Sequence, residues 1–219
     1  MSRIFLIGAH GKVARLLTPQ LVSAGHAVTA FIRNPDHQTD VIADGAMPLV
    51  FDLEQADTDA IATQLQDHDA VVWSAGAGGG NAERTYAVDR DAAIRAMDAA
   101  VQARVRRFVM VSYLNAGLEH GVQPGDAFFA YAQAKAAADA WLRGTPLDWT
   151  ILGPGKLTLA EASGRIAIDP GTAPADTETS RANVAQVIAA TLRMPSTIGR
   201  TIGFIDGDVP IDAALAAVG

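Results

Sequence analysis

A tyrosine and a lysine that together can move a proton stand four positions apart, at Tyr131 and Lys135. If this stretch is helical, both side chains lie on one face of the helix. A lysine ammonium favours the tyrosine anion, so the pair predicts a phenol that carries protons more readily at neutral pH. Ser112, at the end of an apolar run, is placed to hydrogen-bond the same substrate oxygen. We interpret the three as a catalytic set; a surface pair at Tyr131 and Lys135 is the alternative.

The first apolar run and the turn after it form the clearest binding motif of the chain. Ile4 to Ile7 is typical of a strand buried on both faces, and a helical pattern begins directly after Gly11. Gly8 can adopt backbone angles barred to other residues, and Gly11 lets a pyrophosphate approach. The helix N-terminus then points its free N–H groups at the phosphates. We predict dinucleotide contacts from Gly8, His10, Gly11, Lys12 and Val13.

The end of the second expected strand, His26 to Ile32, distinguishes the two nicotinamide cofactors. NAD-selective sites usually carry an acidic residue here to bind the ribose 2′-hydroxyl, and Arg33 stands there instead. An arginine at this position favours a 2′-phosphate, and Lys12 can supply a second charge. The prediction is NADP(H), with NAD(H) as the alternative cofactor; an arginine merely solvated at a strand end is the competing interpretation.

Two more strand ends belong to the same edge of the expected sheet. Met47 to Phe51 leads into Asp52 and Leu53, where the carboxylate either meets the adenine or is a solvated loop group. The buried run Ala70 to Trp73 enters a glycine-rich turn, Ser74 to Gly80, for which a plain linker is the alternative. Two glycine turns at one sheet edge predict a crevice between them. Its further cofactor contacts are predicted at Asp52, Leu53, Ser74, Ala75 and Gly76.

The remaining elements alternate strand with helix, which predicts an α/β fold with one doubly wound, Rossmann-type parallel sheet of about seven strands. The last three strands are expected at Arg106 to Ser112, Leu147 to Leu152 and Thr201 to Ile205. Helices are expected at 56–65, 82–103 and 127–143, and from a Ser180 cap to Leu192. We expect a single domain over 1–219, with 153–179 and 206–219 as a small C-terminal cap on the substrate side, the first segment being mobile.

Composition excludes several classes of function. The net charge of −7 argues against a nucleic-acid binder, which usually carries a basic patch. Without cysteine there is no disulfide and no thiolate nucleophile, and the histidines lack metal-ligand spacing, so we expect no metal. No apolar run is long enough to span a bilayer, and the chain opens directly into a strand, so the expected location is the cytoplasm, without a membrane partner.

Several motifs together resemble the short-chain dehydrogenase/reductase superfamily, and most closely its atypical NAD(P)H-binding branch of NmrA-like and sugar-epimerase-like proteins. The resemblance covers nearly the whole chain; its motifs are 8–14, 31–35, Asp52-Leu53, 106–112, 131–135, Pro154-Gly155 and 180–185. It implies a Rossmann fold with strand order 3-2-1-4-5-6-7. It also implies that Ser112 and Tyr131 surround the reacting oxygen, that Lys135 binds the nicotinamide ribose, and that Pro154 and Gly155 lie near the carboxamide.

The sequence departs from the family pattern at two positions. Ala14 replaces the third glycine of the fingerprint, and Gly153 replaces an arginine that often precedes the Pro-Gly pair, which affects the substrate side. Many members of this branch have lost the catalytic tyrosine and serve as sensors or have no known substrate.

Three functions follow from these features. The first is an NADPH-dependent oxidoreductase acting on a small carbonyl or quinone-like substrate, as a monomer or homodimer. The second is an NADP(H)-binding redox sensor or regulator without turnover, and the third is a sugar epimerase or dehydratase. The joint presence of Ser112, Tyr131 and Lys135 favours the first, since a sensor needs no proton donor.

Overall fold

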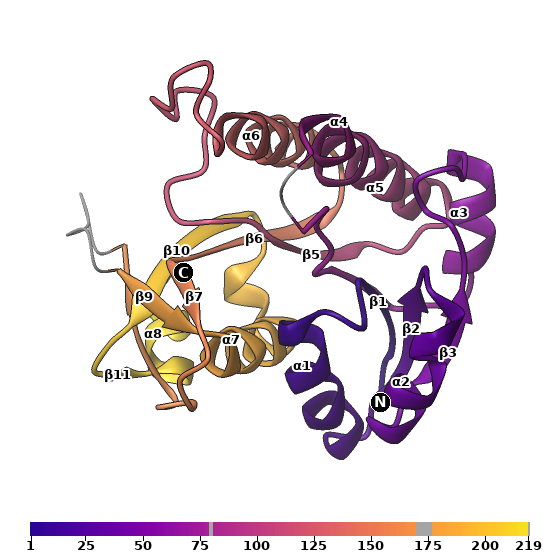
Figure 1. The fold of residues 1–219 in the computed structure, drawn as a ribbon. Helices are drawn as coiled ribbons and strands as arrows, with labels where there is room; N and C mark the ends of the chain where they lie inside the picture. The colour runs from indigo at the N-terminus through magenta and orange to yellow at the C-terminus, as the bar shows by residue number, and fades with distance from the viewer. Residues whose placement is uncertain (79–80, 170–176, 219) are drawn as a thin grey trace.

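A single sheet with helices on both faces forms the frame of the protein (Figure 1). The computed structural model describes residues 1–78, 81–169 and 177–218. The sheet has nine strands, in the order β11-β8-β10-β6-β5-β4-β1-β2-β3. They are β1 Arg3–Ile7, β2 Ala27–Ile32, β3 Met47–Val50, β4 Ala70–Trp73, β5 Arg107–Val111, β6 Asp148–Pro154, β8 Arg165–Ile168, β10 Arg200–Asp206 and β11 Val209–Pro210.

The seven strands expected from the sequence lie in the expected order. Strands β3, β2, β1, β4, β5, β6 and β10 follow one another across the sheet, and each neighbouring pair is parallel. The prediction of a doubly wound Rossmann-type sheet is therefore confirmed. Because all seven are parallel, their carboxyl ends meet at one edge, as the site requires.

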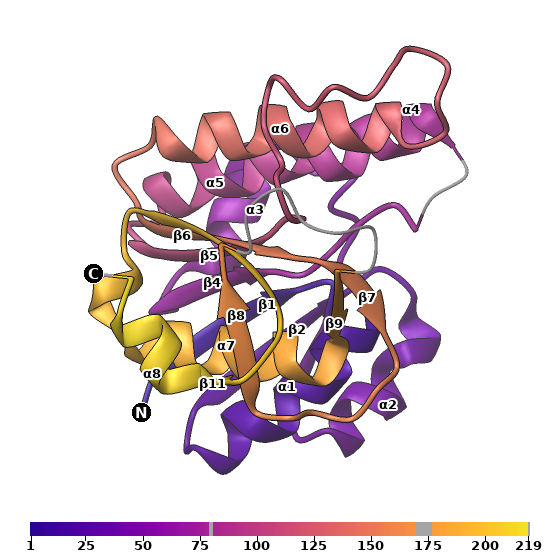
Figure 2. The ribbon, with the colours of Figure 1, turned by 90° about the vertical axis from the view of Figure 1, so that its left-hand side faces the viewer.

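Two layers of helices cover the sheet (Figures 1 and 2). The helices are α1 Lys12–Ser23, α2 Gln38–Ala43, α3 Thr58–Leu65, α4 Ala82–Thr85, α5 Ala93–Gln102, α6 Phe129–Arg143, α7 Arg181–Arg193 and α8 Ile211–Ala216, with short 3₁₀ turns at η1 Pro35–His37 and η3 Pro195–Thr197. On one side lie α3, α5 and α6, whose core includes Phe5 and Ile7; on the other lie α1, α7 and α8, whose core includes Ile4 and Leu6. Alternate residues of a strand point to opposite faces, so β1 supplies both cores.

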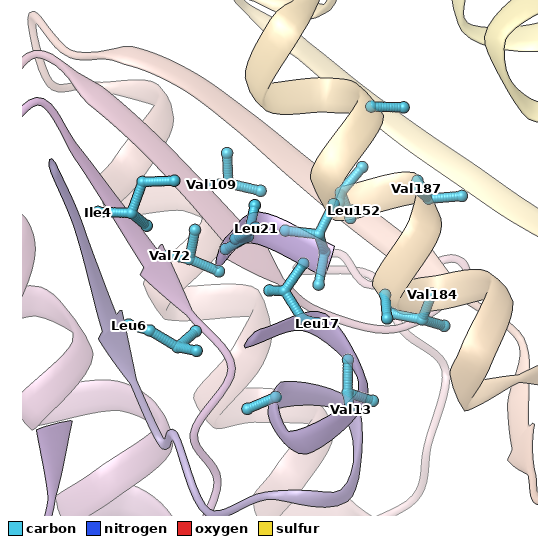
Figure 3. Packing of buried hydrophobic residues seen from close by; sticks show 14 of the residues in the cluster. Ile4, Leu6, Val13, Leu17, Leu21, Val72, Val109, Leu152, Val184 and Val187 are labelled. Carbon is cyan, nitrogen blue, oxygen red and sulfur yellow. The ribbon is translucent and has the colours of Figure 1, made fainter. Parts of the chain in front are cut away.

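The packing of α1 and α7 against the sheet fixes the angle at which α1 leaves the first turn. Val13, Leu17 and Leu21 of α1 lie between the sheet and the α7 residues Val184 and Val187 (Figure 3). All five side chains are at least nine-tenths buried. The spacing of 13, 17 and 21 is that of one helix face, so the apolar stripe of α1 aims its N-terminus along the carboxyl edge of the sheet.

The long helix expected at 82–103 is interrupted. Between α4 and α5 the chain forms a π-helix, η2 Tyr86–Ala92. π-turns carry one extra residue per turn and occur often at functional sites. Here the segment holds Asp89, whose side chain is buried and accepts a hydrogen bond from the Ala77 N–H at 2.9 Å.

The segment 153–179, expected to be a mobile cap, is only partly loop in the described residues. It contains β8, which pairs antiparallel with β10, and β7 Lys156–Thr158, which pairs with β9 Glu178–Ser180 in a second, two-stranded sheet. The last segment, 206–219, adds β11 and α8, and Ile211 and Leu215 of α8 enter the core on the α1 side. Residues 170–176 lie outside the described part, and the mobility of the cap stays a prediction.

Candidate active site

The turn after β1 has the backbone that a phosphate-binding turn needs. Gly8 has φ +80°, a left-handed angle that favours glycine, and the Gly11 N–H donates to the Gly8 carbonyl at 2.8 Å. Gly11 is the N-cap of α1 and makes no side-chain cap bond, and the first turn of α1 holds no acidic residue. The first N–H groups of a helix have no partner within the helix, so this N-terminus can bind an anion.

The two glycine turns predicted from the sequence touch one another. A Cβ atom placed on Gly8 would lie 2.6 Å from the Ala75 Cα, so only glycine fits where the turn after β1 passes the turn after β4. The Ser74 N–H continues the β1–β4 pairing by donating to the Ile7 carbonyl at 3.0 Å. Gly79 and Gly80, the last residues of the predicted second turn, lie outside the described residues.

A cavity of about 310 Å³ opens at the carboxyl ends of β1, β2 and β4. Its lining includes eight of the residues predicted to bind the cofactor, namely Gly8, His10, Gly11, Arg33, Leu53, Ser74, Ala75 and Gly76. Ile7, Phe31, Ile32, Val88 and Ala92 give it apolar walls, and four polar residues that the sequence analysis missed complete it: Asn34, His37, Glu54 and Arg84. An apolar cavity with a few polar groups is the usual form of a small-molecule site.

Arg33 does not face the cavity as a free cation. Its Nη1 donates to Glu54 Oε1 at 2.5 Å, and Arg84 Nη2 donates to the same oxygen at 3.1 Å. Arg84 Nη1 also donates to the Ala77 carbonyl at 2.6 Å, which ties α4 to the turn after β4. Two arginines from different elements thus share one carboxylate at the cavity wall.

His10, beside the first turn, contacts the side chains of Asp40 and His37. Its Nε2 lies 2.7 Å from Asp40 Oδ2, and its ring stacks on His37 with centroids 3.5 Å apart. Arg15 on α1 pairs with the same carboxylate of Asp40 at 3.0 Å and also with Asp44. These contacts join α1 to the residues that follow β2 and close one side of the cavity.

The other predicted cofactor residues lie outside the cavity lining. Asp52 Oδ1 accepts from the Glu54 N–H at 3.0 Å and shapes the loop, while the Val13 side chain belongs to the core (Figure 3). Lys12 is exposed at the start of α1. Pro154 ends β6, and the Gly155 N–H donates to the Phe204 carbonyl at 3.0 Å. The last two lie at the same sheet edge, farther along toward β10.

The predicted catalytic residues meet where the end of β5 runs beside α6. Lys135 Nζ donates to the Val111 carbonyl at 2.7 Å, next to Ser112 in the chain. The rings of Tyr113 and Tyr131 pack with centroids 5.6 Å apart. The structure thereby brings Ser112, Tyr131 and Lys135 to one junction, although no hydrogen bond joins them directly within the described residues.

An acidic residue absent from the sequence-based set, Asp139, lies at this junction. The Ser112 hydroxyl donates to Asp139 Oδ2 at 2.5 Å, and the carboxyl is fully buried. Asp139 follows Lys135 by four positions, as Lys135 follows Tyr131, so the three share one face of α6. This repeat of the four-residue spacing was the signal by which the sequence could have identified it.

Burial sets the ionisation of these groups, and it contradicts one expectation from the sequence. The pKa of Tyr131 is raised, first by burial and then by the negative charges of Asp89 and Asp139, whereas the nearby lysine was expected to lower it. The pKa of Lys135 is lowered by burial, against the opposing effect of the two carboxylates. Burial also raises the pKa of Asp139 and of Asp89. Loss of hydration is the largest cause of all four shifts.

Comparisons with known proteins define the class to which this fold and site belong. A family model described as NAD(P)H-binding matches residues 8–195, and the chain belongs to that NAD(P)H-binding family. Among its relatives, the uncharacterized sugar epimerase YhfK of Bacillus subtilis is 33% identical over 218 residues, with 97% of this chain and 98% of the relative covered.

Solved structures agree with this assignment. A protein of Bacillus halodurans, assigned as a candidate NAD-dependent epimerase/dehydratase, has a TM-score of 0.91 and 32% identity, with 99% of this chain and 100% of that chain covered. The oxidoreductase ylbE of Lactococcus lactis has a TM-score of 0.84 and 29% identity, covering 98% of this chain and 95% of that chain.

In residues 1–78, 81–169 and 177–218, no helix is long and apolar enough to cross a membrane. Nor does any group of three or more metal-ligating side chains gather in these ranges.

Proposed function

We propose that the protein is an oxidoreductase of the short-chain dehydrogenase/reductase type that uses NADPH to reduce a small carbonyl or quinone-like compound. The observation that supports this most is the junction of β5 and α6, where Ser112, Tyr131 and Lys135 gather on the same sheet edge as the cavity. A sensor has no use for a proton donor at this place.

The residues at the edge fit a nicotinamide dinucleotide. The Gly8 turn and the free N-terminus of α1 suit the pyrophosphate, and the cavity between β2 and β4 suits the adenosine half. Its volume of about 310 Å³ is at the lower end of ligand pockets, which range from ~300 to ~1,000 Å³. The other half would extend toward Lys135, Pro154 and Gly155, which lie beyond the cavity on the same edge.

The side chains at the junction have separate tasks in this proposal. The bound cofactor supplies a hydride. Tyr131 donates its proton to the oxygen of the substrate carbonyl, and its raised pKa keeps the phenol protonated at neutral pH, as an acid must be. Lys135 holds the nicotinamide ribose and places positive charge beside the tyrosinate that forms. Ser112 orients the substrate oxygen with the hydroxyl proton that it otherwise donates to Asp139.

A second candidate is an NADP(H)-binding sensor without turnover, and one observation favours it. The single hydroxyl proton of Ser112 is donated to Asp139, and one N–H of the Lys135 ammonium is donated to the Val111 carbonyl. A reductase must redirect the Ser112 hydrogen bond when the substrate binds, whereas a sensor can keep it.

The epimerase or dehydratase alternative is supported mainly by the names of similar proteins. A nucleotide sugar needs a substrate lobe, but the C-terminal segments β8, β10 and β11 extend the main sheet. We therefore rank it below the other two.

One experiment separates these functions. NADPH is titrated against the protein by its fluorescence, and the complex is then mixed with a panel of carbonyls and quinones while NADPH oxidation is followed. The reductase proposal expects binding followed by oxidation with at least one compound. Binding without oxidation across the panel, under conditions in which a known reductase reacts, favours the sensor.

Replacing Arg33 by alanine should weaken NADPH binding about ten- to a hundredfold and leave NADH binding nearly unchanged, because a charged hydrogen bond to the 2′-phosphate is worth about 1.5–3 kcal/mol. Fluorescence titration with both cofactors measures this. Arg106→Ala is the matched control, since Arg106 is also exposed and paired with one carboxylate, Asp148, but lies at the opposite edge. Equal affinity of the wild-type protein for NADPH and NADH would contradict the assignment of Arg33.

A further inference from the structure

The cavity wall contains an acidic residue, Glu54, beside Arg33 at the end of β2, where the sequence itself has no acidic residue. Glu54 follows β3, yet its Oε1 lies 2.5 Å from Nη1 of Arg33 at the end of β2. The Glu54 side chain is 21% exposed and that of Arg33 is 55% exposed, so the carboxylate is the more buried partner. Parallel pairing of β2 with β3 places the ends of these strands side by side and so joins residues 21 positions apart.

A second arginine converges on the same carboxylate from the other side of the cavity. Arg84 on α4 donates Nη2 to Glu54 Oε1 at 3.1 Å, and its Nη1 is held by the Ala77 carbonyl. All three side chains line the cavity. The trio therefore carries two guanidinium groups against one carboxylate, with an excess of one positive charge where an anion of the ligand can enter.

The chemistry of this trio matches a phosphate. Arginines bind phosphate and carboxylate oxygens with the same planar fork, so a carboxylate held between two arginines occupies the position that a phosphate would take. Glu54 and an incoming phosphate must compete for Arg33 and Arg84. NADH carries a 2′-hydroxyl in place of this phosphate, so it brings no competitor for the arginines and leaves the trio intact.

On the basis of the proposed function, we infer that Arg33 and Arg84 together form the 2′-phosphate site and that Glu54 is its internal competitor. Glu54 thereby sets the ratio of NADPH to NADH affinity. Arg33 alone does not determine cofactor choice in this account, because its charge is partly neutralised by Glu54 and supplemented by Arg84.

Glu54→Gln tests the competition directly. The amide keeps the size of the side chain and removes its charge, so NADPH should bind about three- to tenfold more tightly, on the scale of a partly exposed ion pair. NADH affinity should stay within about twofold of wild type, since no phosphate is present to compete. Asp212→Asn, which breaks the exposed pair with Arg193 at 3.2 Å, is the control and should change neither affinity.

Two further variants test the partners of Glu54. Arg84→Gln should weaken NADPH binding about tenfold with little effect on NADH. In the Arg33→Ala background, Glu54→Gln should increase NADPH affinity less than it does in the wild-type protein. One of the two arginines that the substitution releases is absent there. Thermal unfolding of each variant establishes that the fold is retained.

Calorimetric titration with nucleotide fragments locates the effect on the ligand. 2′-AMP carries the phosphate in question and 5′-AMP does not, so Glu54→Gln should tighten binding of the first and leave the second unchanged. Unchanged or weaker NADPH binding by Glu54→Gln, in a protein whose wild type binds NADPH, overturns this inference alone. If the wild-type protein binds neither NADPH nor NADH, the proposed function itself fails.

Discussion

Replacing Tyr131 by phenylalanine should lower the rate of carbonyl reduction about 10²- to 10⁴-fold, the usual value of a positioned general acid. The substitution removes only the hydroxyl, and the ring keeps its packing against Tyr113 and Phe128. NADPH affinity should hardly change. Single-turnover oxidation of bound NADPH, with a substrate identified from the panel, measures the effect.

Tyr113→Phe is the matched control for this experiment. Tyr113 is a neighbouring tyrosine whose hydroxyl has no hydrogen-bond partner in the part of the chain that the structure describes. As with Tyr131, burial raises the pKa of Tyr113. Its loss should leave the rate within about twofold, because no proton passes through it. A wild-type rate for Tyr131→Phe would make Tyr131 a packing residue.

The pH dependence follows from the same residue. Because the pKa of Tyr131 is raised, its phenol stays protonated through neutral pH, so the rate of reduction should show no loss from this group between about pH 6 and 9. A rate that falls across this range in wild type and equally in Tyr131→Phe would assign the titration to another group.

Lys135→Met should lower both the rate and the affinity for NADPH. The ammonium is fully buried, donates to the Val111 carbonyl and interacts with the charges of Asp89 and Asp139, so its loss removes a buried positive charge from the junction. We expect a rate loss of at least about 10²-fold and a rise of roughly tenfold in the NADPH dissociation constant. Methionine fills a similar volume, which preserves the packing of α6.

Lys156→Met provides the comparison for a lysine outside the junction. Its side chain is 78% exposed and pairs only loosely with Glu178, at 3.6 Å. If Lys135→Met binds NADPH as tightly as the wild-type protein does, α6 does not face the cofactor. The role of Tyr131 as proton donor would then lose its geometric basis.

Local sequence patterns were sufficient for the parts of the site that depend on one turn or one helix. The strand that ends at Ile7, the turn at Gly8 and the helix that begins after Gly11 are all found where the pattern predicts them. Ser180 caps α7 by accepting from the Asn183 N–H, as expected. These features depend on backbone angles and side chains within a few residues, so the sequence specifies them directly.

Features that depend on distant contacts were not visible in the sequence. Glu54 reaches Arg33 only through the pairing of β2 with β3, and Arg84 reaches Glu54 across the cavity. The expected continuous helix at 82–103 contains a π segment, and Asp89 in that segment is buried and accepts a hydrogen bond from the distant Ala77 N–H. The antiparallel strand β8 likewise depends on distant partners, since it pairs with β10 and with β11.

The pKa of Tyr131 shifts in the direction opposite to the expectation because it depends on burial in the folded protein. Spacing along α6 places Tyr131, Lys135 and Asp139 on one helix face, but it does not tell how deeply they are buried. The three-dimensional fold buries the phenol and adds Asp89 from η2. Burial and the negative charges of the two carboxylates then raise the pKa of Tyr131.

The central claim is that an NADPH molecule lies across the turns after β1, β2 and β4. Hydrogen exchange of the wild-type protein, measured with and without saturating NADPH, tests it without any substitution. If NADPH lies there, exchange should be slower at 8–14, 32–34 and 74–77, the segments that contribute residues to the cavity lining or continue directly from them. Unchanged exchange in all three segments, or protection confined to another part of the molecule, would contradict it.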